Sequence, residues 1–357
     1  MTAKINAAES IRGLACLAVV FSHLAMSFFP FLHHFDPTET TDLNWVYQVH
    51  HLPLGFLYSG DAVVFVFFVL RGYVLSYAIL KKTEQFQSRL KSMMVKRYPR
   101  LMIPALTSCL IIWATLSIID IDSRHVGLWL QAFAQQDFSF KTALYEGTIG
   151  AFLFSDSNIN WVLWTMTIEL MGSFVLFFLL VLYQWKHGVF WLGSVLVLVL
   201  AYMWRGQGFC MGIASFVIGI YIYLYAKQLS ACFAVLLLIL GLYLAGAHNT
   251  SQAYSWLYAL WGEHTYDYSN FLAGPIIVYS VLMSPLLSKG LDHPILVWLG
   301  KLSFSIYLMH LLVLTLVCIP LFNVFLKWQW SYSQSAICSG LLAILATLVV
   351  ADVYSRY

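Results

Sequence analysis

Charged residues are scarce in this sequence. Only 10% of its 357 residues are Asp, Glu, Lys or Arg, whereas 61% are hydrophobic, and the mean hydropathy is +0.78. Soluble domains carry about 25% charged residues, so a soluble protein of this size could not cover its surface with so few. The scarcity excludes a disordered chain, a coiled coil and a nucleic-acid-binding protein, and the long apolar runs predict a polytopic protein embedded in the lipid bilayer.

The usual motifs of soluble enzymes and metal sites are absent as well. The sequence contains no GxSxG, Walker A, HExxH or GxGxxG motif. Its six cysteines lie in or at the edges of apolar runs and none forms a CxxC pair, which predicts lone thiols, no disulfide and no bound metal. No repeat, low-complexity tract or long linker divides the chain, so we expect residues 1–357 to form a single membrane domain.

The apolar runs predict an all-α fold with about ten transmembrane helices. They are apolar on every face, whereas the strands of a membrane barrel alternate, and a helix of about 20 residues crosses the hydrocarbon core. The first run is too long for a removable signal peptide, and the patch at 148–154 is too short to span. The predicted spans are 12–32, 59–80, 101–120, 161–183, 189–204, 209–226, 232–247, 269–287, 302–322 and 333–351.

The positions of Lys and Arg predict the orientation. With a cytoplasmic N-terminus, the inner segments hold thirteen of these residues and the outer segments four. The positive-inside rule therefore places both termini in the cytoplasm. The outer segments 33–58, 121–160 and 248–268 are rich in Trp, Tyr, His and Asp, which indicates either an aromatic belt at the membrane interface or a face that stacks on sugar rings.

Six ionisable residues lie within the predicted spans, where a charge costs at least a few kcal/mol. They are Arg12, His23, Asp61, Arg71, Glu169 and His310. Arg12 and His23 are eleven residues apart, almost three helical turns, so they share one face with His23 roughly 16 Å deeper. Arg12 suits an anionic phosphate and His23 a general base; alternatively, Arg12 snorkels and His23 hydrogen-bonds another helix.

Four of these groups come at similar depth, which predicts one buried polar cavity. They are His23, Arg71, Glu169 and His310; a structural Arg71–Glu169 ion pair is compatible with the cavity. The basic inner loop 81–100 ends in Arg97-Tyr-Pro-Arg100. Two arginines three residues apart, directly before a span, suit the phosphates of a nucleotide-like cofactor, although they also serve as a plain topology signal.

Six sequence blocks follow one another in an order typical of one family. They are Glu9-Ser-Ile-Arg12 continuing to His23, Gly60-Asp61 with Phe67-Phe68-Val69-Leu70 and Gly72-Tyr73, Lys96-Arg97-Tyr98-Pro99-Arg100, Trp164 to Glu169, Gly208-Phe209 with Gly212, and Leu299 to His310. Together they resemble the acyltransferase-3 family of membrane O-acyltransferases, in its stand-alone form without an extracytoplasmic hydrolase-like domain. Two features depart from the family pattern: Arg71 stands where relatives usually have a small residue, and the acidic segment after the last span is matched only in part.

The resemblance implies an acetyl-CoA-dependent O-acetyltransferase of the inner (plasma) membrane. Such proteins pass an acyl group from cytoplasmic acetyl-CoA to a hydroxyl of an exported glycan such as O-antigen, capsule, exopolysaccharide or peptidoglycan. We therefore expect His23 to act as general base or acyl acceptor, and Arg97, Arg100 and Arg12 to hold the coenzyme A phosphates. Glu169 is expected to set the charge or tautomer of a histidine, and His310 to orient the acceptor.

Two other functions fit part of the sequence. Buried His, Glu and Arg also suit the proton relay of a proton-coupled transporter or of a flippase for lipid-linked glycans. Transporters often show paired broken helices in inverted repeats, and no such pairing is found in this sequence. A non-catalytic scaffold of a glycan-synthesis complex is the third alternative; it predicts that changes at His23 or Arg12 affect stability alone.

Overall fold

The computed structural model describes residues 2–36 and 38–356, and within this part of the chain it contains helices and no strand. Seven helices among the described residues are long and apolar enough to cross a membrane. The prediction of an all-α polytopic membrane protein is therefore confirmed.

The longer helices carry most of the apolar surface. They are α1 (Thr2–Phe28), α3 (Gly60–Leu80), α4 (Phe86–Leu116), α7 (Met166–Trp185), α8 (His187–Tyr225), α11 (Thr265–Leu282), α13 (Pro294–Val313) and α15 (Tyr332–Tyr354). Shorter α-helices connect them: α2 (Asn44–His51), α5 (Leu128–Ala134), α6 (Phe140–Tyr145), α9 (Ala231–Ala245), α10 (Ser255–Trp261), α12 (Pro285–Gly290) and α14 (Ile319–Lys327). The remaining elements are the 3₁₀ turns η1 (Pro30–Leu32), η2 (Gly55–Tyr58), η3 (Thr83–Gln85), η5 (Trp161–Thr165), η6 (Gln252–Tyr254) and η7 (Gly262–His264), with the π-helical segments η4 (Glu146–Phe154) and η8 (Leu314–Cys318).

Each predicted span overlaps a helix of the structure. The spans 189–204 and 209–226 correspond to the two halves of α8, which meet at Gly206, where a φ of 78° breaks the helix in a region that favours glycine. The spans 232–247 and 269–287 correspond to α9 and α11, which are not among the seven long apolar helices. Ten crossings therefore remain a prediction. The short patch 148–154 lies on η4.

Close helix crossings at small residues position the elements that carry the ionisable groups. A Cβ atom on Gly13 of α1 would lie 2.7 Å from the backbone nitrogen of Gly300 on α13, and one on Gly219 of α8 would lie 2.8 Å from the Cα of Gly72 on α3. Small residues let helix backbones approach in this way inside membranes. The crossing of α1 with α13 places the residues that follow Gly13 against those that follow Gly300.

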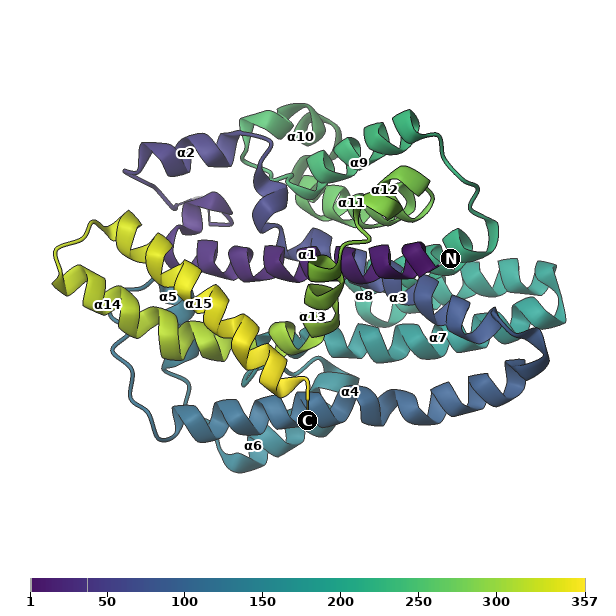
Figure 1. Cartoon of the computed structure of the whole chain (residues 1–357), viewed down its shortest axis with the longest axis horizontal. Coiled ribbons are helices and arrows are strands. Elements are labelled where there is room, and N and C mark those ends of the chain that lie inside the picture. Colours follow the sequence, from purple (N-terminus) through teal and green to yellow (C-terminus); the bar gives the residue numbers. More distant parts are fainter. Residues whose placement is uncertain (1, 37, 357) are drawn as a thin grey trace.

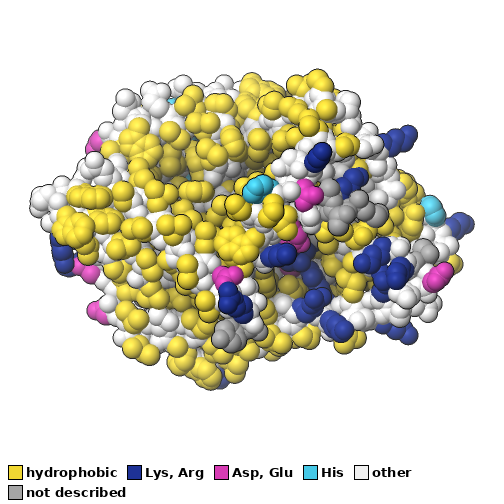
Figure 2. Space-filling view, viewed as in Figure 1, with side chains coloured by type: hydrophobic (Ala, Val, Ile, Leu, Met, Phe, Trp, Pro, Cys, Tyr) yellow, Lys and Arg dark blue, Asp and Glu magenta, His cyan; other side chains and the backbone are white. Residues whose placement is uncertain are grey.

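The elements lie mainly along the long axis of the molecule. Helices α1, α3, α4, α7 and α8 run in this direction, and α14 and α15 slant across one end (Figure 1). Figure 2 shows most of the visible Lys and Arg side chains gathered at the end that holds the start of α1 and of α4, with a broad apolar surface beyond them. This separation is the pattern expected for a cytoplasmic N-terminus, which remains a prediction.

Candidate active site

Two histidines from α1 and α13 form a direct pair. The Nδ1 atom of His23 lies 2.6 Å from the Nε2 atom of His310, and the two rings stack almost in parallel, 4.9 Å apart. The Nδ1 atom of His310 lies 2.9 Å from the carbonyl oxygen of Ile306. That oxygen can only accept, so in the neutral pair His310 carries its proton on Nδ1 and accepts on Nε2 from the Nδ1–H of His23. The Nε2 atom of His23 is then left with a free lone pair.

The free nitrogen of His23 belongs to a cavity with aromatic walls, which we call the histidine cavity. It has a volume of about 450 Å³, and its lining includes His23, Asp61, Trp129, Trp161 and Tyr266. The ring of Trp129 stacks on His23 with centroids 4.9 Å apart. Among the described residues nothing hydrogen-bonds Nε2 of His23. This nitrogen is therefore available to take a proton from a ligand hydroxyl.

A second cluster ties three helices through Glu169 on α7. Its Oε1 atom forms an ion pair with Nε of Arg71 on α3 at 2.8 Å and accepts a hydrogen bond from Nη2 of Arg97 on α4 at 2.5 Å. Arg97 also donates from Nε to the Ser173 hydroxyl at 2.7 Å. The Arg97 and Glu169 side chains are 9% and 7% exposed. Because removal of Glu169 would leave two arginines without their common partner, Glu169 joins α7 to both α3 and α4.

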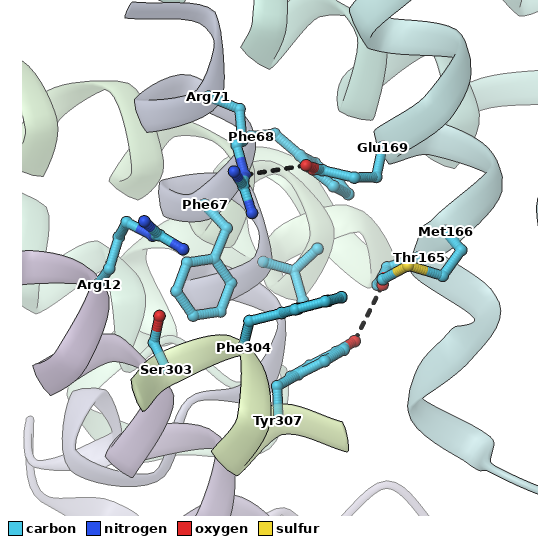
Figure 3. Close-up of a pocket in the computed structure, with 11 residues that line it drawn as sticks. Arg12, Phe67, Phe68, Arg71, Thr165, Met166, Glu169, Ser303, Phe304 and Tyr307 are labelled. Carbon is cyan, nitrogen blue, oxygen red and sulfur yellow. Dashed lines mark hydrogen bonds and ion pairs between the residues drawn. The ribbon is translucent and has the colours of Figure 1, made fainter. Parts of the chain in front are cut away.

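Arg12 and Arg71 share a further pocket, which we call the arginine pocket. It has a volume of about 50 Å³, and Figure 3 shows both guanidinium groups turned toward the same space beside Phe67. Arg12 also pairs with Glu9 at 3.0 Å. Three arginines (Arg12, Arg71 and Arg97) and two glutamates (Glu9 and Glu169) leave one net positive charge in this region, which favours an anionic ligand.

Tyr307 and Val64 line both spaces and so form part of the wall between them. The Tyr307 hydroxyl lies 2.7 Å from the carbonyl oxygen of Val162, to which it donates, and 3.0 Å from the Thr165 hydroxyl. The sequence predicted one polar cavity for the four ionisable groups. In the structure Arg71 and Glu169 line one space and His23 lines the other, and the two spaces share Tyr307 and Val64.

The predicted site residues fall into three places. Arg12 lines the arginine pocket, His23 lines the histidine cavity, and His310 contacts His23. Glu169 binds two arginines and no histidine in the described part of the chain. Arg97 is buried against Glu169, while the side chain of Arg100 is exposed; that these two arginines and Arg12 hold the coenzyme A phosphates stays a prediction.

Several residues that line the two spaces were not predicted as site residues from the sequence. Tyr307 was recognised only as a member of the block that ends in His310, and Asp61 only as a charge within a span. Trp129 and Trp161 were predicted only as part of the aromatic outer segment 121–160 and of a span. Their position beside His23 depends on tertiary packing, which local patterns do not contain.

No group of three or more His, Cys, Asp or Glu side chains that could hold a metal ion is found within residues 2–36 and 38–356.

Comparison with family models finds one match: the acyltransferase-3 model, described as an acyltransferase domain, aligns with residues 5–356. Searches of curated proteins and of solved structures return no match.

Proposed function

Because this chain belongs to the acyltransferase-3 family and is a membrane acyltransferase, we propose that it transfers an acetyl group from cytoplasmic acetyl-CoA to a hydroxyl of an exported glycan. The acceptor would be an O-antigen, capsule, exopolysaccharide or peptidoglycan sugar, and the protein would lie in the inner (plasma) membrane. One observation supports this most: His23, whose Nε2 has no partner among the described residues, lines an aromatic cavity, and this cavity adjoins a cationic pocket at Tyr307 and Val64.

The arginine pocket suits the donor. Coenzyme A carries phosphates at one end and a thioester at the end of a slender arm. A further space beside the start of α1 is lined by Lys4, Tyr73, Tyr77 and Tyr183. These residues offer a cation and flat rings to a nucleotide. The arm would continue toward Arg12 and Arg71, whose positive charge stabilises the thiolate that leaves when the thioester is cleaved.

The reaction balances with His23 as the only base. Nε2 of His23 removes the proton of the sugar hydroxyl while the hydroxyl oxygen attacks the thioester carbonyl. The carbon–sulfur bond breaks, and the coenzyme A thiolate takes up the proton that His23 then releases, which regenerates the neutral imidazole. His310 keeps His23 in the tautomer that leaves Nε2 unprotonated. General base catalysis of this kind contributes about 10²–10⁴-fold to the rate. An acyl-histidine intermediate at Nε2 would use the same geometry.

The first test uses the full chain in proteoliposomes with radiolabelled acetyl-CoA. We expect the wild type to bind acetyl-CoA and to transfer label to a cell-envelope glycan fraction. We expect His23→Ala to keep acetyl-CoA binding and lose transfer, and Arg97→Ala to impair binding as the arginine cluster loosens. His264→Ala serves as the matched control, because His264 lies exposed in a connecting segment.

Two results would overturn the proposal. Transfer at the wild-type rate by His23→Ala, at equal protein level, would remove the catalytic role of His23. Neither binding nor turnover of acetyl-CoA by well-folded wild type would favour the proton-coupled transporter or flippase instead.

A further inference from the structure

The histidine cavity contains a carboxylate that the proposed reaction does not use. Asp61 lies in the first turn of α3 and lines the same cavity as His23. The side chain of Tyr266 on α11 lies beside the carboxylate. In the described part of the chain Asp61 forms no ion pair with Lys, Arg or His. The negative charge of Asp61 therefore faces the cavity without a cation.

Capping of α3 does not account for Asp61. A carboxylate in the first turn interacts favourably with the helix dipole, but the N-terminus of α3 already has a cap, because the Ser59 hydroxyl accepts from the backbone N–H of Ala62. An unpaired charge at the edge of a membrane-spanning segment costs free energy. This cost in free energy is offset when a ligand donates hydrogen bonds to the carboxylate.

The side chains that line the cavity beside Asp61 indicate the chemical class of the ligand. Indole rings of Trp129 and Trp161 meet edge to face with centroids 5.2 Å apart, and Trp164 also lines the cavity. Aromatic faces pack on the C–H faces of a sugar ring, while a carboxylate accepts strong hydrogen bonds from hydroxyl groups. A mainly apolar cavity with a few convergent polar groups is the usual form of a small-molecule site.

We propose that Asp61 is an acceptor-binding residue and that the acceptor is a sugar ring with neighbouring hydroxyls. The Asp61 carboxylate accepts a hydrogen bond from one hydroxyl, the ring packs against Trp129 and Trp161, and another hydroxyl meets Nε2 of His23. The idea rests on the proposed function and adds to it the residue that orients the acceptor.

The test measures sugar binding directly. The full chain in detergent is titrated at millimolar concentrations with the methyl glycosides of glucose, mannose and rhamnose and with N-acetylglucosamine, and tryptophan fluorescence is followed because three tryptophans line the cavity. We expect a saturable change with at least one probe. Loss of a hydrogen bond to a charged group should weaken that binding about 10-fold or more in Asp61→Asn.

Matched variants separate binding from folding. Asp267→Asn is the control, since Asp267 is an exposed carboxylate near Asp61 that does not line the cavity. Acetyl-CoA binding should be unchanged in Asp61→Asn, because Asp61 does not line the arginine pocket. If Asp61→Asn does not fold, Tyr266→Phe replaces it, and we expect it to weaken sugar binding about 3-fold or more.

Each outcome decides the proposal. Loss of the sugar response in Asp61→Asn but not in Asp267→Asn supports it. Wild-type affinity in folded Asp61→Asn, or no response of the wild type to any probe, overturns it. A sugar response that depends on Asp61, in a protein that never consumes acetyl-CoA, would leave the acceptor site standing and refute the proposed donor instead.

Discussion

The molecule contains two histidine pairs that differ in what their outer nitrogens meet. In the pair between His33 and His248, Nδ1 of His33 lies 3.3 Å from Nε2 of His248, and Nδ1 of His248 lies 3.0 Å from the carbonyl oxygen of Gly246. The pair of His23 and His310 repeats this chain, with a backbone carbonyl again at its inner end. The outer nitrogen of His33 is 3.2 Å from the Ser22 hydroxyl, whereas that of His23 has no partner in the described residues and opens into a cavity.

The comparison shows that pairing with a second histidine does not by itself distinguish a structural histidine from a reactive one. Both nitrogens of His33 are occupied, so this pair joins the segment after α1 to the segment after α9. The same arrangement between α1 and α13 leaves one lone pair available to a ligand. Whether the outer ring nitrogen has a hydrogen-bond partner therefore determines whether the pair can act as a base.

The largest effect should come from removing the free nitrogen. We expect His23→Ala to lower acetyl transfer by about 10²–10⁴-fold, because the general base is lost, whereas His33→Ala should retain transfer within about 3-fold and lose thermal stability. Initial rates of transfer to the envelope glycan fraction, at equal protein level, give the comparison. Equal losses of activity in the two variants would remove the distinction between the pairs.

The next effect concerns the residue behind the base. His310→Phe takes away the atom that accepts from Nδ1–H of His23, so the imidazole is no longer held in its productive tautomer, and we expect kcat to fall about 10–100-fold with little change in KM for acetyl-CoA. His310→Gln retains a side-chain oxygen acceptor and should recover part of the loss. A role of His310 in packing alone would give both variants the same kcat.

The pair of His33 and His248 should make the folded protein less stable in acid. Burial lowers the pKa of His33 from its ordinary value of 6.5 to about 4, and that of His248 to about 3. The unfolded chain therefore binds more protons than the folded one below pH 6.5, so stability falls as the pH drops toward 4. Titration of His33 alone lowers the free energy of unfolding by about 2 kcal/mol between pH 7 and pH 5.

The melting temperature of the detergent-solubilised protein measures this dependence. We expect it to fall from pH 7 to pH 5, and to fall less steeply in His33→Gln, which lacks the titrating ring. A pH slope in His33→Gln as steep as in the wild type would show that other groups cause the acid sensitivity.

The sequence predicts the helices of this protein far better than the partners of its ionisable groups. The spans follow from local hydropathy, and even the break in α8 at Gly206 coincides with the polar interruption between two predicted spans. Arg97 and Arg100 look equivalent in sequence, yet only Arg97 meets Glu169 and Ser173 of α7. Likewise, that Tyr307 lines both spaces depends on how the helices pack, which no single helix determines.

The smallest effect should come from Arg71, where the family usually has a small residue. Arg97 still pairs with Glu169 when Arg71 is replaced, so Arg71→Ser should fold normally and keep the histidine pair intact. The arginine pocket would lose one of the two positive charges that stabilise the leaving thiolate, and we expect kcat/KM for acetyl-CoA to fall about 3–10-fold, with Arg12 retaining part of the effect. A fall in kcat as large as that of His310→Phe would show that the two spaces are coupled through their common wall and that the contrast between the free and the occupied histidine nitrogen is insufficient to explain activity.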